Sequence, residues 1–120
     1  MTGGRPKSWR WMPRMTDKWA ADVIVEAGRM RGVRPAQIMR RNQKRNPSYA
    51  RMGVVYVMKE AGYVLADIAE TLGMSDHTSA LYSLNVAKRL RDEDPEYLAF
   101  TDELLAYALS IKPKADAEAA

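Results

Sequence analysis

The sequence between Leu65 and Leu84 reads LADIAETLGMSDHTSALYSL, and its pattern predicts two helices joined by a sharp turn. Apolar residues recur in its first part at the spacing of one helix face: Leu65, Ile68, Ala69 and Leu72. Gly73 follows, and helices often end on glycine because it adopts the left-handed conformation without strain. Ser75 or Asp76 then caps the second helix. We therefore expect helices over about 64–72 and 76–91.

The second helix is expected to bury a stripe of apolar residues spaced by three: Leu81, Leu84, Ala87 and Leu90. Leu81 and Leu84 follow Gly73 by eight and eleven positions, whereas the matching pair of the commonest helix-turn-helix follows its turn glycine by about six and nine. The turn is therefore expected to be about two residues longer, which exposes four side chains at the helix tip: Asp76, His77, Thr78 and Ser79. A recognition helix contacts base edges with such a tip, although two ordinary packed helices joined by a polar loop fit the same pattern.

The rest of residues 16–111 predicts four further helices, and no stretch sustains the alternation typical of a strand. The first is expected to begin near Thr16 or Asp17 and the second at Pro35, and the other two are expected to follow the N-caps Asn46 and Asp94. The apolar residues expected to pack inward include Ile38, Met39, Leu98 and Leu109. The predicted fold class is all-α, with about six helices in one compact domain that contains a helix-turn-helix at about 64–91.

Length and composition exclude several classes of protein. A chain of 120 residues is sufficient for one domain. It contains no cysteine, which excludes a disulfide scaffold and a thiolate zinc site and indicates a reducing compartment. No apolar run approaches the roughly 18 residues that span a bilayer, and residues 1–8 lack the apolar core of a signal peptide. We therefore expect a cytoplasmic protein with no membrane partner, no metal and no cofactor.

The charged residues are distributed unevenly along the chain. Residues 1–60 contain 14 Lys and Arg against 4 Asp and Glu, a net charge of +10. Residues 61–120 contain 5 against 11, a net charge of −6. Such polarity predicts one cationic face, for which nucleic acid is the commonest partner, although a solubilising surface is the alternative.

Two basic segments account for much of the positive charge. Residues 1–15 form a basic aromatic arm, expected to be flexible, in which Arg5, Lys7 and Arg10 alternate with tryptophan and proline. Such an arm can lie along a phosphate backbone or enter a minor groove, or its tryptophans can fold back onto the core. The second segment is 40–46, RRNQKRN, with four cations and no acid, which is too charged to be buried. Residues 112–120 are expected to form a flexible tail.

Three stretches together resemble the C-terminal DNA-binding domain (domain IV) of the bacterial replication initiator DnaA. GMSDHTSAL at 73–81 resembles the family signature G-G-R-D-H-T-T-V-L. GVRPAQIMRR at 32–41 resembles the family segment that precedes its basic loop, and LADIAETLG at 65–73 resembles L-P-E-I-G-x-x-F-G. Their order and the lengths between them also match. The resemblance covers about residues 20–109 and implies a TrpR/DnaA domain IV-like fold that binds double-stranded DNA.

The resemblance also implies roles for individual residues. Asp76, His77 and Thr78 would face the major groove, together with Ser79. The basic loop would send an arginine into the adjacent minor groove, and further residues would contact the DNA backbone. The complete set expected at the backbone or minor groove is Arg40, Arg41, Lys44, Arg45, Arg51, Lys59 and Tyr82. The arm would add contacts from Arg5, Lys7 and Arg10.

The sequence also departs from the family pattern. Met74 and Ser75 stand where the family has Gly-Arg, which removes a cation at the tip, and Ala66 replaces a proline. The preferred DNA sequence is therefore expected to differ from that of the family. The chain has no phosphate-loop glycine-lysine motif, so no nucleotide cofactor and no ATPase activity are expected.

The leading functional hypothesis is sequence-specific binding of double-stranded DNA by a small regulator of transcription or replication, of the kind encoded by bacteriophages or mobile elements. One alternative is a non-specific or architectural DNA binder, and another is a small terminase-like packaging adaptor whose acidic last helix mediates oligomerisation. An enzyme is not expected, because one histidine and no cysteine do not assemble a nucleophile, base and orienting group.

Overall fold

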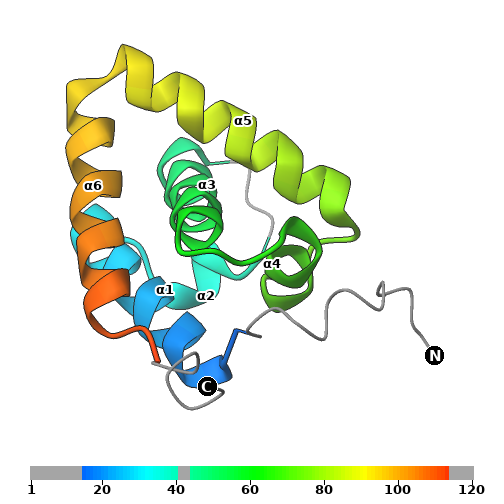
Figure 1. Ribbon diagram of the computed structural model, residues 1–120. Helices are drawn as coiled ribbons and strands as arrows, with labels where there is room; N and C mark the ends of the chain where they lie inside the picture. The colour runs from blue at the N-terminus through cyan, green and yellow to red at the C-terminus, as the bar shows by residue number, and fades with distance from the viewer. Residues whose placement is uncertain (1–14, 41–43, 114–120) are drawn as a thin grey trace.

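A computed structural model describes residues 15–40 and 44–113 of the chain. In these residues it has six helices and no strand, which confirms the all-α prediction (Figure 1). The helices are α1 (Asp17–Arg31), α2 (Pro35–Ile38), α3 (Arg45–Glu60), α4 (Leu65–Thr71), α5 (His77–Glu93) and α6 (Pro95–Ser110). The expectations of a flexible arm and tail fall almost wholly on residues 1–14 and 114–120, which lie outside the described residues.

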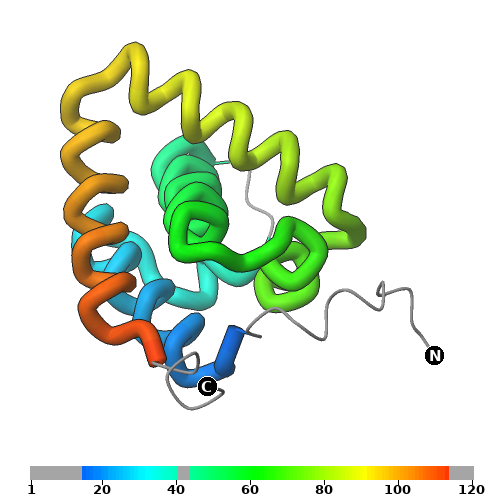
Figure 2. Tube along the Cα trace, in the orientation of Figure 1, coloured from blue at the N-terminus to red at the C-terminus, as the bar shows by residue number. Residues whose placement is uncertain are grey.

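The central element is α3, which packs against each of the other five helices (Figure 2). Six consecutive residues of α3, Gly53–Met58, are buried. A helix that is buried around its whole circumference belongs in the middle of a core. α5 and α6 cover one side of α3, and α1, α2 and α4 cover the rest.

A close contact sets the distance between α3 and α6. A Cβ atom on Gly53 would lie 2.6 Å from the Phe100 ring, so only glycine fits there without displacing the ring. The hydroxyl of Tyr97 donates a hydrogen bond to the carbonyl of Tyr49 at 2.7 Å. α1 is held to α6 in a similar way, because the indole of Trp19 donates to the carbonyl of Ala108 at 2.9 Å.

Most helix boundaries agree with the local sequence signals. Thr16 caps α1, Pro35 opens α2, and Asp94 caps α6 immediately before Pro95. Asn46 was expected to cap α3, and this prediction is wrong because the N-cap is Lys44, two residues earlier. The Asn46 side chain instead joins the end of α1, accepting from Arg31 Nε at 3.1 Å and donating to the Arg31 carbonyl at 2.8 Å.

Four residues expected to be buried are exposed: Met39, Leu81, Leu98 and Leu109. For Leu81 the reason is geometric. At 3.6 residues per turn, Leu81 and Leu90 lie about 180° apart around the helix, so both cannot face one core. α5 buries Ala80, Ser83, Leu84, Ala87 and Leu90. The first buried residue of α5 is therefore Ala80, which follows Gly73 by seven positions. The turn is thus shorter than we predicted from the position of Leu81.

Candidate nucleic-acid interface

The junction between α4 and α5 is built by local hydrogen bonds. Gly73 has φ 69°, in the left-handed region. Its amide donates to the Glu70 carbonyl at 3.3 Å, and the Met74 amide donates to the Ala69 carbonyl at 2.8 Å. This pair of bonds is the Schellman arrangement that ends a helix on glycine. α5 then begins immediately after Asp76, which has an extended backbone.

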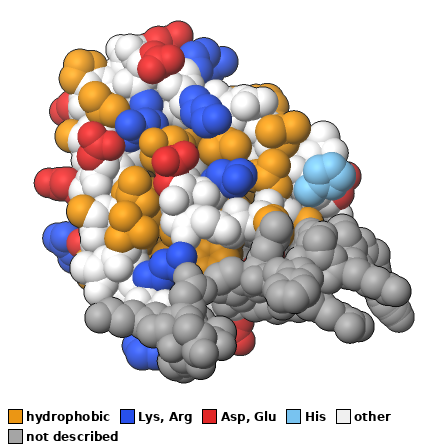
Figure 3. All heavy atoms as spheres, viewed as in Figure 1, with side chains coloured by type: hydrophobic (Ala, Val, Ile, Leu, Met, Phe, Trp, Pro, Cys, Tyr) orange, Lys and Arg blue, Asp and Glu red, His pale blue; other side chains and the backbone are white. Residues whose placement is uncertain are grey.

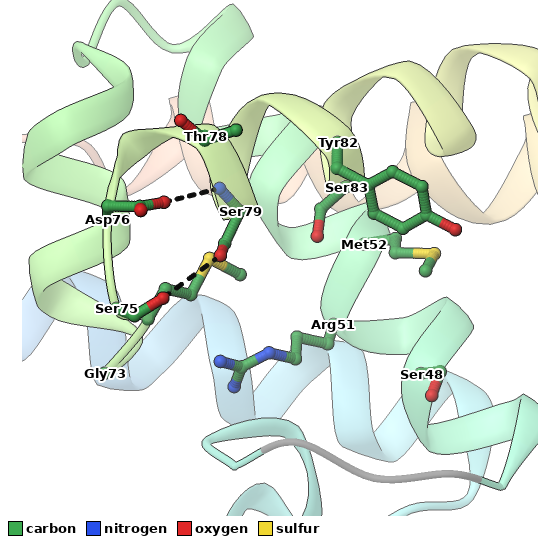
Figure 4. Close-up of a pocket in the computed structure, with 11 residues that line it drawn as sticks. Ser48, Arg51, Met52, Gly73, Ser75, Asp76, Thr78, Ser79, Tyr82 and Ser83 are labelled. Atoms are coloured by element: carbon green, nitrogen blue, oxygen red, sulfur yellow. Dashed lines mark hydrogen bonds between the residues drawn. The ribbon is translucent and has the colours of Figure 1, made fainter.

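The start of α5 is exposed. Asp76, His77 and Thr78 are exposed and Ser79 is half-buried. Figure 3 shows the protein's single histidine protruding at one edge of the molecule. The Asp76 carboxylate accepts a hydrogen bond from the Ser79 amide at 3.1 Å, so Asp76 caps α5 and its position is set by the backbone. The hydroxyls of Ser75 and Ser79 lie 3.4 Å apart (Figure 4).

An open pocket of about 720 Å³ separates the start of α5 from the first half of α3 (Figure 4). Hydroxyl groups from both helices and from the turn line it: Ser48, Ser75, Thr78, Ser79, Tyr82 and Ser83. Arg51 and Met52 contribute from α3, and Asp76 contributes from the tip. The pocket thus brings three of the predicted site residues at the tip together with Arg51 and Tyr82. Tyr82 is 65% exposed at the pocket edge.

Arg51 is half-buried beside this pocket. Its guanidinium donates to two backbone carbonyls, from Nη1 to Ile38 at 2.6 Å and from Nη2 to Leu72 at 3.0 Å. Burial lowers the pKa of the Arg51 guanidinium, but arginine keeps its charge in proteins. The pocket therefore has a fixed positive charge at its side.

Residues on either side of the basic segment lie near the same pocket. Arg40, Lys44 and Arg45 are exposed, while Arg41 lies outside the described residues. Before the segment, the carbonyl of Met39 would lie 3.9 Å from a Cβ on Gly73, so the end of α2 adjoins the turn before α5. After the segment, Ser48 lines the pocket. Met39 before the segment and Ser48 after it thus lie near the pocket, although Arg40, Lys44 and Arg45 do not line it.

Several predicted residues do not line the pocket, including His77 at the tip and the exposed cations Arg40, Lys44 and Arg45. Lys59 is exposed near the far end of α3, two helical turns beyond Arg51, and it does not line the pocket. Arg5, Lys7 and Arg10 lie outside the described residues. The first described residue, Met15, donates its amide to the Asp67 carboxylate on α4 at 3.2 Å.

Several residues that line the pocket were not predicted from the sequence. Ser48 and Met52 lie on α3, and Ser83 lies on α5 among residues of the core. None belongs to a motif, and serine and methionine occur on many helix surfaces. Only the packing of α3 against α5 places them around one cavity.

Acidic side chains gather away from the pocket. Asp92, Glu93 and Asp94 lie at the far end of α5, about 25 Å from the tip at 1.5 Å per residue. Figure 3 shows further acidic side chains over α6 and its junction with α5. Lys88, Arg89 and Arg91 lie on the same part of α5, so this end of the helix is mixed in charge, and the length of α5 separates it from the tip.

Other kinds of site find little support in the described residues. Within 15–40 and 44–113, no three His, Cys, Asp or Glu side chains gather as ligands for a metal ion. No helix in this part of the chain has the length and apolarity required to cross a membrane.

A comparison with models of known protein families and a search of curated proteins find no match.

Proposed function

We propose that this protein binds double-stranded DNA in a sequence-specific manner, with α4 and α5 as a helix-turn-helix and α5 as its recognition helix. The observation that best supports this proposal is the exposed tip of α5 beside a pocket whose other wall is α3, the helix that begins with the exposed cations Lys44 and Arg45. Elements that contact the major groove and a neighbouring backbone or minor groove are arranged in this way. A recognition helix, about 10–12 Å across, fits a major groove about 12 Å wide.

The chemistry of the tip suits contact with base edges. His77 and Thr78 are exposed and lie on the first turn of α5, where a helix-turn-helix contacts bases. The threonine methyl can pack on the methyl group of thymine, and hydroxyl and imidazole groups can form hydrogen bonds with base edges. Asp76 can accept from the amino group of cytosine with the carboxylate oxygen lone pairs that the cap leaves unused.

The surrounding groups suit contact with phosphates. Arg40, Lys44 and Arg45 are exposed cations, and cations of this kind supply affinity without sequence information. The hydroxyls of Ser48 and Tyr82 add neutral donors at the pocket edge. The far end of α5, where Arg89 pairs with Glu93, would be directed away from the duplex.

The DnaA-like motif supports a role as a small regulator of replication or transcription, as in a bacteriophage or a mobile element. The residues that resemble the signature of domain IV, Asp76-His77-Thr78, are the residues exposed at the tip. The proposed cellular location is the bacterial cytoplasm or nucleoid, where such a protein meets DNA.

The proposal is tested by selecting bound duplexes from a random library and then titrating an enriched and a shuffled duplex at one salt concentration. We expect the enriched duplex to bind at least about 10³-fold more tightly than random DNA. A ratio near one, with measurable affinity for both duplexes, would identify a non-specific or architectural binder. No affinity for any duplex would refute the proposal, and a stable ring in sedimentation without DNA would then favour the packaging adaptor.

A further inference from the structure

One guanidinium joins the ends of two helices that precede the proposed DNA-contacting segments. Arg51 on α3 donates to the carbonyl of Ile38, the last residue of α2, at 2.6 Å and to that of Leu72, the C-cap of α4, at 3.0 Å. Carbonyls at helix C-termini lack an intrahelical donor and bear partial negative charge. A single cation therefore satisfies two such ends at once.

These two carbonyls come shortly before the two segments that are proposed to contact DNA. Arg40, the first residue of the basic segment, follows Ile38 by two positions, and Asp76, the first residue of the tip, follows Leu72 by four. The two helix ends also lie close together, because a Cβ on Gly73 would lie 3.9 Å from the carbonyl of Met39. Arg51 thus holds the points from which both segments leave the core.

We propose that Arg51 is a positioning residue that sets the spacing between Arg40, just after the end of α2, and the tip of α5, and thereby determines sequence preference. This inference rests on the proposed function and gives Arg51 a role other than a phosphate contact. Arg40 and the tip would meet different parts of one duplex. Their separation must therefore be constant if the tip is to meet the same base pairs each time.

Arginine is specifically suited to this position. Its planar guanidinium presents donors on two terminal nitrogens, which reach two carbonyls in different directions. A lysine ammonium on a flexible stem is a point charge and lacks this fork. Arg51→Lys therefore keeps the charge and removes the bridge, whereas Arg51→Met removes both. Arg29→Met is the matched control, because Arg29 is exposed on α1, where it pairs with Glu26.

The first test measures amide hydrogen exchange in the protein without DNA. The amide of Met39 is bonded to the Pro35 carbonyl and that of Met74 to the Ala69 carbonyl, so each reports on one helix end. In both Arg51 variants we expect both amides to exchange at least about tenfold faster, because local opening governs exchange. The amide of Ala61, at the far end of α3, should keep its rate, as should all three amides in Arg29→Met.

The exchange experiment can either support or overturn the proposal. Faster exchange at Met39 and Met74 together supports the proposal, and acceleration at one amide alone or at neither overturns it. If Ala61 accelerates equally in Arg51→Met, the whole domain has been destabilised, and the charge-conserving Arg51→Lys decides.

The second test measures binding to the selected duplex and to random DNA across salt concentrations. We expect Arg51→Lys to lower the ratio of specific to random affinity about tenfold or more, with an unchanged salt slope on random DNA. A wild-type ratio in Arg51→Lys, together with a slope reduced by about 0.9 in Arg51→Met, would show a phosphate contact and overturn the proposal. If the wild-type protein binds no duplex, the proposed function fails, while the exchange test still decides whether Arg51 holds both helix ends.

Discussion

The carboxylate of Asp76 accepts a hydrogen bond from the Ser79 amide at 3.1 Å, so the first residue of the proposed base-contacting tip is also the N-cap of α5. The two roles can be separated by substitution. Asp76→Ala removes the cap and is expected to lower the free energy of unfolding by about 1 kcal/mol, measured by urea denaturation. Asp76→Ser keeps a capping oxygen, and its stability should stay close to that of the wild type.

Binding measurements on the same variants test the second proposed role of this carboxylate, which is contact with a base. If Asp76 contacts a base, Asp76→Ser should lose preference for the selected duplex although its stability is retained. Wild-type preference in this variant would mean that Asp76 acts through the cap alone.

His77 and Thr78 are exposed and are not N-caps, so their replacement should affect binding rather than folding. His77→Ala and Thr78→Ala are each expected to weaken binding to the selected duplex by roughly 1–3 kcal/mol, while binding to random DNA stays nearly constant. Fluorescence titration of both duplexes at one salt concentration measures the difference. Equal losses on the two duplexes would argue against base contact by the substituted residue.

Arg45 is exposed at the first turn of α3, beside the proposed backbone contacts. Arg45→Ala is expected to weaken binding to all duplexes and to reduce the slope of log affinity against log salt by about 0.9 for one lost phosphate contact. Arg29→Ala removes the same charge on α1 and should leave the slope unchanged. A slope in Arg45→Ala equal to that of the wild type would exclude a phosphate contact by Arg45.

The sequence predicted the helices well because their signals are local. Thr16, Asp76 and Asp94 cap helices with their own side chains, and each acts within three residues. Gly73 ends α4 in the left-handed conformation, as its place after an apolar stripe predicted. Such signals depend on the chain immediately around them and are little affected by the rest of the fold.

The parts that the sequence did not predict depend on contacts between distant residues. The bonds from Arg51 to Ile38 and Leu72 span 13 and 21 positions, and the resemblance alone assigned Arg51 to DNA. Leu81 was predicted to be buried because residues spaced by three lie near one face of a helix over a short range. Over the nine residues from Leu81 to Leu90, however, this spacing moves halfway around the helix. Ser83 is buried, which its polar side chain did not predict.

Gly53 allows α3 and α6 to approach closely, since a Cβ there would lie 2.6 Å from the Phe100 ring. Gly53→Ala is expected to lower the free energy of unfolding by about 1–3 kcal/mol through overpacking, offset by up to about 1 kcal/mol from the helix propensity of alanine. Thermal unfolding monitored by circular dichroism measures the change. In a Phe100→Leu background the same substitution should cost less, and an equal cost in both backgrounds would exclude the ring contact as the cause.

Tyr97 gives the domain a stability that should depend on pH in alkaline solution. Its buried hydroxyl donates to the Tyr49 carbonyl at 2.7 Å, and burial raises the pKa of the phenol above its ordinary value. Because the folded pKa is the higher one, the neutral phenol contributes its full stability below the unfolded pKa of about 10. That contribution is lost as the pH rises from there through the folded pKa.

Tyr97→Phe removes both the hydrogen bond and this titration. At pH 7 we expect a loss of about 1 kcal/mol, the usual net value of one hydrogen bond. Above about pH 10 the variant should lose stability less steeply than the wild type, so the two unfolding free energies converge. Urea denaturation across this range measures both effects, and Tyr82→Phe, at an exposed ring, is the matched control. Parallel curves for Tyr97→Phe and wild type would show that the Tyr97 phenol does not account for alkaline destabilisation.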